Sequence, residues 1–274
     1  IDLCQRVSRL FRITLYQKEN SNYKTKEFEM LVQKENKIGE TVAKNFRASK
    51  VFESYGLDFC CGGKKSIEAA CSEKKIDTGK VLADLAMIQD INDINAHYQN
   101  WEPDFLVEYI INNHHTYVTN SISTIEHHLQ KVVNAHGERH PETAQVQVCF
   151  TDLKNELLDH MAKEEKMLFP YIKKMCFALK NTLEIPAAPF GTVENPIKMM
   201  EAEHDNAGIV MKEISTLTDS YTPPADACAT FRVLYNELQE FENDLHMHVH
   251  LENNILFPKA LLLEKKMNQI FETL

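Results

Sequence analysis

Two stretches of this sequence share one pattern, and that pattern decides the fold. Residues 160–170 read HMAKEEKMLFP, and residues 248–258 read HVHLENNILFP. Both contain a histidine, a glutamate four positions later, and Leu-Phe-Pro starting four positions after the glutamate. Residues four apart on a helix lie on nearly the same face, so each pair points an imidazole and a carboxylate in one direction. The duplication predicts two matching helical halves.

Apolar residues extend the pattern with the spacing of amphipathic helices. Four long segments beyond Pro103 have such a stripe, and breaks at residues 137–141, 185–189 and 222–224 separate them. Each stripe must be buried against the others, which four antiparallel helices achieve. The predicted fold class is therefore all-α, with a four-helix bundle over residues 104–274 and a small helical domain over residues 30–97 before it.

The composition agrees with long helices in a globular protein. The 274 residues include only 8 Gly and 9 Pro, and 43% of them are hydrophobic. A net charge of −10 disfavours nucleic acid as a partner, and no apolar stretch is long enough to predict a membrane span. The 7 Cys are an odd number in a chain too long to need disulfides, which predicts a reduced, cytoplasmic protein.

The beginning of the chain divides into an extension and short helices. Residues 1–29 are richer in basic residues than the rest, and we interpret them as an artificial or upstream extension. A transit peptide is the alternative, which their acidic residues disfavour. Apolar spacing then predicts helices over residues 38–55, 66–71 and 80–95, with DFCCGG at residues 58–63 forming a tight turn between the first two.

Polar residues of one chemical kind interrupt the four inward stripes. A buried polar group without a partner costs about 1–3 kcal/mol, so six of them on inward faces need a shared explanation. Imidazole and carboxylate ligands without sulfur suit iron or manganese better than structural zinc. We predict a centre of two metals bridged by the two glutamates, with the ligands His115, His160, Glu164, His204, His248 and Glu252.

Other histidines and acids near the stripes have a plainer interpretation. A solvated surface position is the default for them, and hydrogen bonding to a metal ligand is the alternative. The histidines concerned are His114, His127, His128, His136, His140, His246 and His250. The same two interpretations hold for Glu165, Glu201 and Glu203.

Cys60 and Cys61 are neighbours in the predicted turn. A disulfide between adjacent residues is strained, so a structural bridge is not expected. A Gly-Gly turn lets backbone amides approach a thiolate and lower its pKa, which would make one thiol reactive. Two ordinary buried thiols are an equal alternative on the residues alone. We interpret the remaining cysteines as small core or surface residues: Cys4, Cys71, Cys149, Cys176 and Cys228.

The DFCCGG turn followed by two His/Glu motifs in a bundle resembles the repair-of-iron-centres proteins, over roughly residues 35–265. The members of that family have an ScdA-type N-terminal domain and a hemerythrin-like C-terminal domain. The resemblance implies two iron ions as the cofactor, bound by the six residues above and bridged by Glu164 and Glu252. It also favours a redox or iron-transfer role for Cys60 and Cys61.

The function implied by this resemblance is repair of iron–sulfur clusters damaged by nitric oxide or oxidative stress, by donation of iron. Nitric oxide reduction at the di-iron centre is a further activity, so whether the chain is an enzyme stays open. Iron–sulfur proteins are the implied clients, and nitric oxide or oxygen the small ligands. The alternatives are a hemerythrin-like sensor or binding module for oxygen, nitric oxide or iron, and a reservoir. The oligomeric state, including a homodimer, stays open.

Overall fold

A computed structural model shows how these segments fold. It describes residues 32–88, 98–184 and 187–272. The predicted extension over residues 1–29 lies outside them, and so does the end of the small domain near residue 97, so these boundaries stay predictions. Every element in the described part is helical, apart from one isolated antiparallel bridge between Lys37 and Ser66. The all-α prediction is confirmed.

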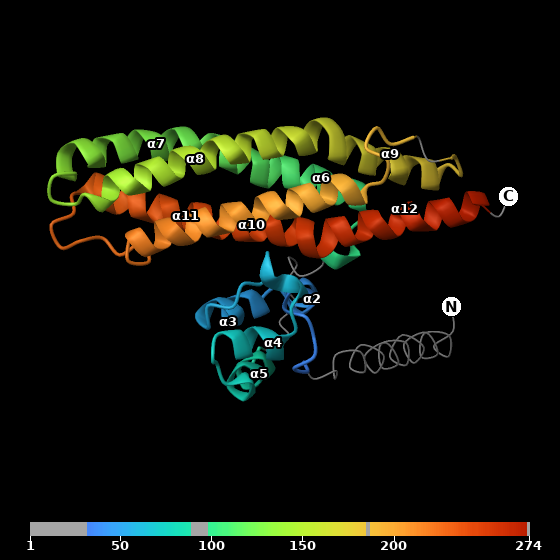
Figure 1. Ribbon diagram of the computed structural model, residues 1–274, viewed down its shortest axis with the longest axis horizontal. Helices are drawn as coiled ribbons and strands as arrows, with labels where there is room; N and C mark the ends of the chain where they lie inside the picture. Colours follow the sequence, from blue (N-terminus) through green and yellow to red (C-terminus); the bar gives the residue numbers. More distant parts are fainter. Residues whose placement is uncertain (1–31, 89–97, 185–186, 273–274) are drawn as a thin grey trace, which may run out of the picture.

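The N-terminal region, residues 32–88, is a group of short helices drawn in blue and cyan in Figure 1. Side chains cap two of them: Ser66 accepts a hydrogen bond from the Ala69 amide at 3.1 Å, and Asp77 accepts one from the Gly79 amide at 2.8 Å. Gly56 follows the second helix with a φ of 62°. The elements are α2 (Ile38–Lys44), α3 (Ala48–Ser54), the 3₁₀ turn η1 (Gly62–Lys64), α4 (Ile67–Glu73) and α5 (Thr78–Ala86).

Two predicted helices of this region have different bounds. The single helix expected over residues 38–55 is broken, because Asn45 is extended and its side chain accepts a hydrogen bond from the Arg47 amide at 3.1 Å. The helix expected from Lys80 begins at Thr78, since Asp77 caps it there. Its expected continuation to residue 95 falls partly outside the described residues.

Four long helical rods form the bundle, and Figure 1 shows them running side by side along the longest axis of the molecule. Three of the rods contain a π-helical segment that joins two α-helices, whereas α10 is continuous. The breaks between the rods fall where the sequence predicted them. The rods are α6 (Pro103–Tyr109), η3 (Ile110–His115) and α7 (Thr116–His136); α8 (Glu142–Lys163), η4 (Glu164–Leu168) and α9 (Phe169–Lys180); α10 (Glu194–Leu217); and α11 (Ala229–Leu251), η5 (Glu252–Leu256) and α12 (Phe257–Glu272).

The buried face of each rod contributes to two apolar clusters, one toward each end of the bundle. One cluster includes Ile125, Phe150 and Leu238, together with the core of the N-terminal region. The other includes Phe169 and Phe257 at the opposite end of the bundle. The inward stripes are thus buried as predicted, and the layer between the two clusters is left for polar side chains.

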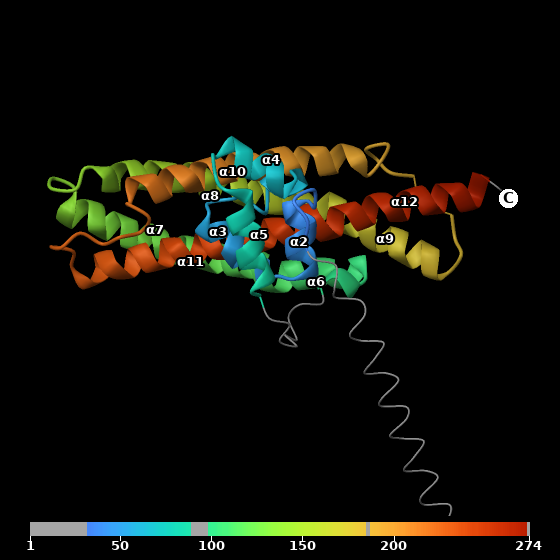
Figure 2. The same ribbon diagram turned by 90° about the horizontal axis from the view of Figure 1, so that it is seen from below.

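The N-terminal region lies against the middle of the bundle, as the two perpendicular views in Figures 1 and 2 show. The Asn254 side-chain amide donates hydrogen bonds to the carbonyl oxygens of Phe59 at 3.2 Å and Cys60 at 3.4 Å. A Cβ built on Gly39 or Gly63 would lie only 2.1 or 2.5 Å from the Asn254 side-chain oxygen. The second glycine of DFCCGG therefore permits close approach to the bundle, a role that differs from the turn-forming role expected for it.

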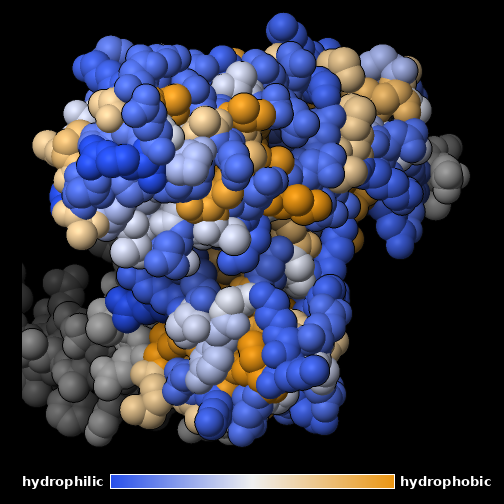
Figure 3. Space-filling view, turned by 60° about the vertical axis from the view of Figure 1, so that its left-hand side comes forward, coloured by the Kyte–Doolittle hydropathy of each residue, from blue (hydrophilic) through white to orange (hydrophobic). Residues whose placement is uncertain are grey.

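The surface of the bundle and of the N-terminal region is mainly hydrophilic on the face drawn in Figure 3, with small scattered hydrophobic patches. Among the described residues, no helix combines the length and the apolar character needed to cross a membrane.

Docking of the N-terminal region is tested by a Gly63→Ala variant. We expect it to lower the free energy of unfolding by about 1–3 kcal/mol, because the new methyl group meets both Asn254 and the Gly39 backbone. Urea unfolding followed by circular dichroism measures this change. Gly62→Ala is the matched control, since its Cβ meets nothing closer than 3.4 Å. Equal stabilities for the two variants would contradict the assigned contact.

Candidate metal centre

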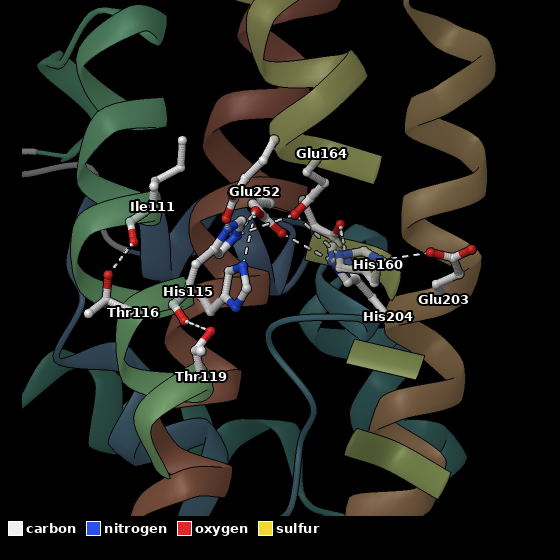
Figure 4. A network of polar contacts seen from close by, with 12 residues as sticks. Ile111, His115, Thr116, Thr119, His160, Glu164, Glu203, His204 and Glu252 are labelled. Atoms are coloured by element: carbon white, nitrogen blue, oxygen red, sulfur yellow. Dashed lines mark hydrogen bonds and ion pairs between the residues drawn. The ribbon is translucent and has the colours of Figure 1, made fainter. Parts of the chain in front are cut away.

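The six residues predicted as metal ligands meet in the polar layer between the two apolar clusters. All of them are buried, with no more than 2% of any residue exposed. Figure 4 shows Glu164 and Glu252 at the centre, with His115 on one side and His160 and His204 on the other. The residues lie at these positions: His115 at the end of η3, His160 on α8, Glu164 at the start of η4, His204 on α10, His248 on α11 and Glu252 at the start of η5.

The three π-helical segments lie at the site itself. Glu164 and Glu252 each begin one, and His115 ends the third. A π turn inserts one residue into a helix and rotates the side chains around it, which re-aims them toward a common centre. The repeated Leu-Phe-Pro was the available signal in the sequence, because proline lacks the amide that a regular helix needs. The hydrophobic spacing of the sequence did not predict these segments.

Contacts divide the six residues into two groups that share both glutamates. The first group contains His115 and His248, and the second contains His160 and His204. In the first group, the His115 Nε2 lies 3.4 Å from Glu164 Oε2, and the His248 Nε2 lies 3.1 Å from Glu252 Oε1. In the second, the His160 Nε2 lies 3.4 Å from Glu164 Oε2, and the His204 Nε2 lies 3.1 Å from Glu252 Oε2. Each group offers two imidazoles and two carboxylates to one cation.

Hydrogen bonds at the far ring nitrogen orient three of the four imidazoles. The Nδ1 atom of His115 lies 2.8 Å from Glu165 Oε1, and that of His160 lies 2.9 Å from Glu203 Oε2. Such bonds fix the tautomer that leaves the Nε2 lone pair free for a metal. Glu165 and Glu203 therefore each bond to a predicted ligand, and Glu165 is also partly exposed.

The other two histidines differ from each other at Nδ1. The His204 Nδ1 lies 2.9 Å from Asn253 Oδ1, whereas the buried His248 Nδ1 has no hydrogen-bond partner. Glu201, for which bonding to a ligand was the alternative, instead forms an ion pair with Lys64 of the N-terminal region at 2.7 Å.

The carboxylates dominate the electrostatics of the centre. Burial lowers the pKa of His115, but hydrogen bonds and charge from Glu164 and Glu252 outweigh it and raise that pKa to about 10. Burial also lowers the pKa of His204, but the hydrogen bond and charge of Glu252 outweigh this effect and raise that pKa to about 9. Burial acts to raise the pKa of Glu252, yet the surrounding imidazoles hold it well below its ordinary value. Without a metal, protons on His115 and His204 therefore offset the buried negative charge.

Polar atoms that lack a hydrogen-bond partner show that a metal pair fits this layer. The buried atoms without a partner include His115 Nε2, both carboxylate oxygens of Glu164 and Glu252 Oε2. Leaving such groups unsatisfied costs about 1–3 kcal/mol each. All of these atoms belong to the two groups that share Glu164 and Glu252, so two bridged cations would satisfy them together.

The solvated default is wrong for three of the remaining histidines. His114 is 5% exposed, and its Nδ1 lies 2.9 Å from Asp244 Oδ1 while its ring stacks on the ring of His248. His250 is buried because the N-terminal region covers it with the rings of Phe46 and Phe59. His136 is also buried. The four that remain at least partly exposed are His127, His128, His140 and His246.

The cysteine turn lies directly behind one of the predicted ligands. The Cys61 Sγ is 3.5 Å from the carbonyl oxygen of His204, and the Cys60 Sγ is 3.8 Å from the Cys61 Sγ. The backbone amides of both cysteines donate hydrogen bonds to Asp58 Oδ1, at 2.9 and 3.0 Å. Contact with Cys61, burial and the Asp58 carboxylate all raise the pKa of Cys60. The lowered pKa expected for a thiol of this turn is thus wrong for Cys60, because the amides bind a carboxylate rather than the sulfur.

Comparison with known proteins agrees with this arrangement of the two regions. The ScdA_N model, a domain of unknown function (DUF542), matches residues 34–89, and the hemerythrin HHE cation binding domain matches residues 107–260. The "Iron-sulfur cluster repair protein YtfE" of Enterobacter sp. (strain 638) is 34% identical, over 82% of this chain and 96% of its own length.

A second relative has the same coverage. The "Probable iron-sulfur cluster repair protein" of Haemophilus influenzae is 34% identical over 82% of this chain and 96% of its own length. The chain belongs to the iron–sulfur cluster repair protein family. In this family member, the two buried groups that share Glu164 and Glu252 match a cation-binding domain, and a di-iron centre is the cofactor that they fit.

The metal content of this family member can be counted directly. We expect two irons per chain after anaerobic loading, and less than half of that in a variant with His160→Ala and His248→Ala, which removes one imidazole from each group. Iron analysis measures the content, and circular dichroism checks that the helices remain. His128→Ala is the control, since His128 pairs with Glu237 outside both groups. One zinc per chain, or full iron in the double variant, would contradict the di-iron assignment.

The metal-free repair protein should become less stable as the pH rises above neutral. The pKa values of His115 and His204 are raised to about 10 and about 9, against about 6.5 in an unfolded chain. Their protonation stabilises the fold fully below about pH 6.5, and this contribution is lost as the pH rises through the folded values. We expect the unfolding free energy to fall between about pH 7 and pH 9, by at most about 1.4 kcal/mol per pH unit for each histidine.

Urea unfolding at several pH values measures this fall, and the iron-loaded protein is the control. Metal replaces the two protons there, so the same pH range should leave its stability nearly unchanged. Equal stability of the metal-free protein at pH 7 and pH 9 would show that protons on these two histidines do not offset the buried negative charge.

Proposed function

We propose that this protein repairs damaged iron–sulfur clusters in client proteins by supplying ferrous iron held in its bundle. The observation that carries the proposal is the pair of buried His/Glu groups sharing Glu164 and Glu252, in a chain whose relatives are named iron–sulfur cluster repair proteins. The proposed ligands are His115 and His248 for one iron, and His160 and His204 for the other. The two irons, when bound, supply exchangeable metal and one-electron chemistry that side chains lack.

A cleft beside the second iron position supports exchange with the surroundings. It has a volume of about 240 Å³ and lies between α8 and α10, with His160 and His204 in its wall. Lys163 and Glu203 also line it, and they form an ion pair with each other. Glu203 contacts both Lys163 and the Nδ1 of His160. The iron held by His160 and His204 is the one we expect to exchange first.

The position of the Cys60/Cys61 turn also favours iron exchange at the His160/His204 position. Cys61 touches the backbone of His204, so the thiols lie next to the iron position that borders the cleft. We propose that the two thiols take part in repair, by transferring iron or by exchanging electrons. Iron–sulfur proteins are the proposed clients, since thiols, of which Cys61 is partly exposed, are chemically suited to bind the iron that sulfur ligands hold.

Nitric oxide reduction is a second candidate function, favoured by the small number of ligands. Each group offers only two imidazoles and two shared carboxylates, which leaves coordination positions open on both metals. Nitric oxide or oxygen would fit such positions, because both are small and uncharged and the polar layer lies between two apolar clusters. The chain's own residues contribute by orienting the imidazoles and by excluding bulk water from the centre.

Repair is tested by mixing the iron-loaded protein, under anaerobic conditions, with an enzyme whose cluster nitric oxide has damaged. We expect the enzyme's activity to return faster than with an equal amount of free ferrous iron. A Cys60→Ser/Cys61→Ser variant should repair several-fold more slowly while it keeps its iron, because its ligands are intact.

Cys149→Ser/Cys228→Ser is the matched control, since these cysteines lie outside the turn and Cys228 is exposed. Equal recovery with free iron would exclude delivery by the protein. Full repair by the Cys60/Cys61 variant would exclude the thiols.

A further inference from the structure

The cysteine turn brings three metal-binding groups together outside the bundle centre. The Asp58 carboxylate and the thiols of Cys60 and Cys61 lie within 4.8 Å of one another, and we call these three residues the turn cluster. The Asp58 Oδ1 is 3.1 Å from the Cys60 Sγ, and the two sulfurs are 3.8 Å apart. We propose that the turn cluster is a separate binding site for one divalent cation that accepts thiolate ligands, with ferrous iron as its cargo.

The separations in the turn cluster match those of a tetrahedral thiolate site. Two sulfurs bound at about 2.3 Å to one metal are about 3.8 Å apart at the tetrahedral angle, which is the separation observed. A carboxylate oxygen bound at about 2.1 Å would lie about 3.6 Å from each sulfur, so the Asp58 oxygen at 3.1 Å needs only a small shift. Three ligands leave a fourth position open for water or for a ligand from a client.

Hydrogen bonds hold the turn cluster in this shape without a metal. The amides of Cys60 and Cys61 both donate to the Asp58 oxygen, and Asn254 of the bundle donates to the Cys60 carbonyl oxygen. The ligands are therefore oriented in advance, which lowers the entropic cost of binding. Asp58 is exposed and Cys61 is partly exposed, so the cluster faces solvent on that side.

Cation binding at the turn cluster exchanges protons for metal. The incoming divalent cation forms bonds to two thiolates and one carboxylate, and the two thiol protons leave to solvent. No electron is transferred. Contact with Cys61, burial and Asp58 all raise the pKa of Cys60, so its proton competes with the metal for the sulfur. This competition favours release, which suits a site that passes iron on.

The turn cluster is positioned to receive iron that leaves the bundle before it reaches a client. Cys61 contacts the His204 backbone, and a Cβ on Gly208, one turn further along α10, would lie 3.7 Å from its sulfur. Iron that leaves the His160/His204 position would thus meet two thiols close by. This role in transfer rests on the proposed function, whereas the site itself rests on the geometry of the three side chains alone.

A cadmium titration of the iron-loaded, reduced protein tests the site. We expect one Cd²⁺ per chain beyond the retained iron, with thiolate-to-metal absorption in the ultraviolet and release of two protons. Cys60→Ser/Cys61→Ser should abolish all three signals. Asp58→Asn should weaken binding by about tenfold or more, because the amide keeps the oxygen that accepts from the turn but loses the charge.

Controls separate this site from other thiols and from misfolding. Cys228→Ser, which changes an exposed cysteine elsewhere, should bind Cd²⁺ like the unchanged protein. Iron content and circular dichroism verify that each variant is folded and loaded. Absence of the extra Cd²⁺, or unchanged binding in Asp58→Asn or in the double cysteine variant, would overturn the three-ligand site.

The repair assay distinguishes failure of the site from failure of the proposed function. If Cd²⁺ binds as expected but the double cysteine variant repairs clients normally, the site stands and its role in repair is excluded. If no Cd²⁺ binds but repair still needs the thiols, the site is excluded and the repair function stands.

Discussion

The burial of two carboxylates in the middle of an apolar bundle is the constraint on which the structure depends. Glu164 and Glu252 are fully buried, with apolar clusters on both sides. A buried charge without a partner is too costly to keep, so the surrounding side chains must supply positive charge. Two of the four imidazoles, those of His115 and His204, have raised pKa values and accept protons when the metal is absent, and all four are placed to bind metal when it is present.

Formal charges in and around this layer are matched to two divalent cations. Glu164 and Glu252 lie inside, and Glu165 and Glu203 bind the outer nitrogens of two imidazoles. These four carboxylates oppose the four positive charges of two divalent ions, and Lys163, paired with Glu203, adds one positive charge, so a loaded centre has little net charge to desolvate. The balance is uneven in space, because the Nδ1 of His204 meets a neutral amide and the Nδ1 of His248, whose ring stacks on that of His114, has no hydrogen-bond partner.

The sequence was sufficient to predict the bundle and the six residues at its centre, because both depend on local spacing. Helical periodicity determines which face is buried, and a His/Glu pair four residues apart shares that face. Features that depend on contacts between distant segments were not predictable. His250 is buried because the N-terminal region covers it, and the pKa of Cys60 is raised because Cys61 contacts it, the fold buries it and the Asp58 carboxylate lies beside it. The π segments were missed because hydrophobic spacing does not distinguish them from a regular helix.

Three consecutive residues of η5 connect the polar layer, the neighbouring helix α10 and the N-terminal region. Glu252 enters the polar layer, Asn253 orients His204, and Asn254 reaches between Gly39 and Gly63 to hold the cysteine turn. The three side chains leave one widened turn in three directions, toward the centre, the neighbouring helix and the N-terminal region. The contact between the two regions and the contribution of η5 to the centre therefore come from the same turn of the backbone. Insertion or deletion of one residue there would disengage both at once.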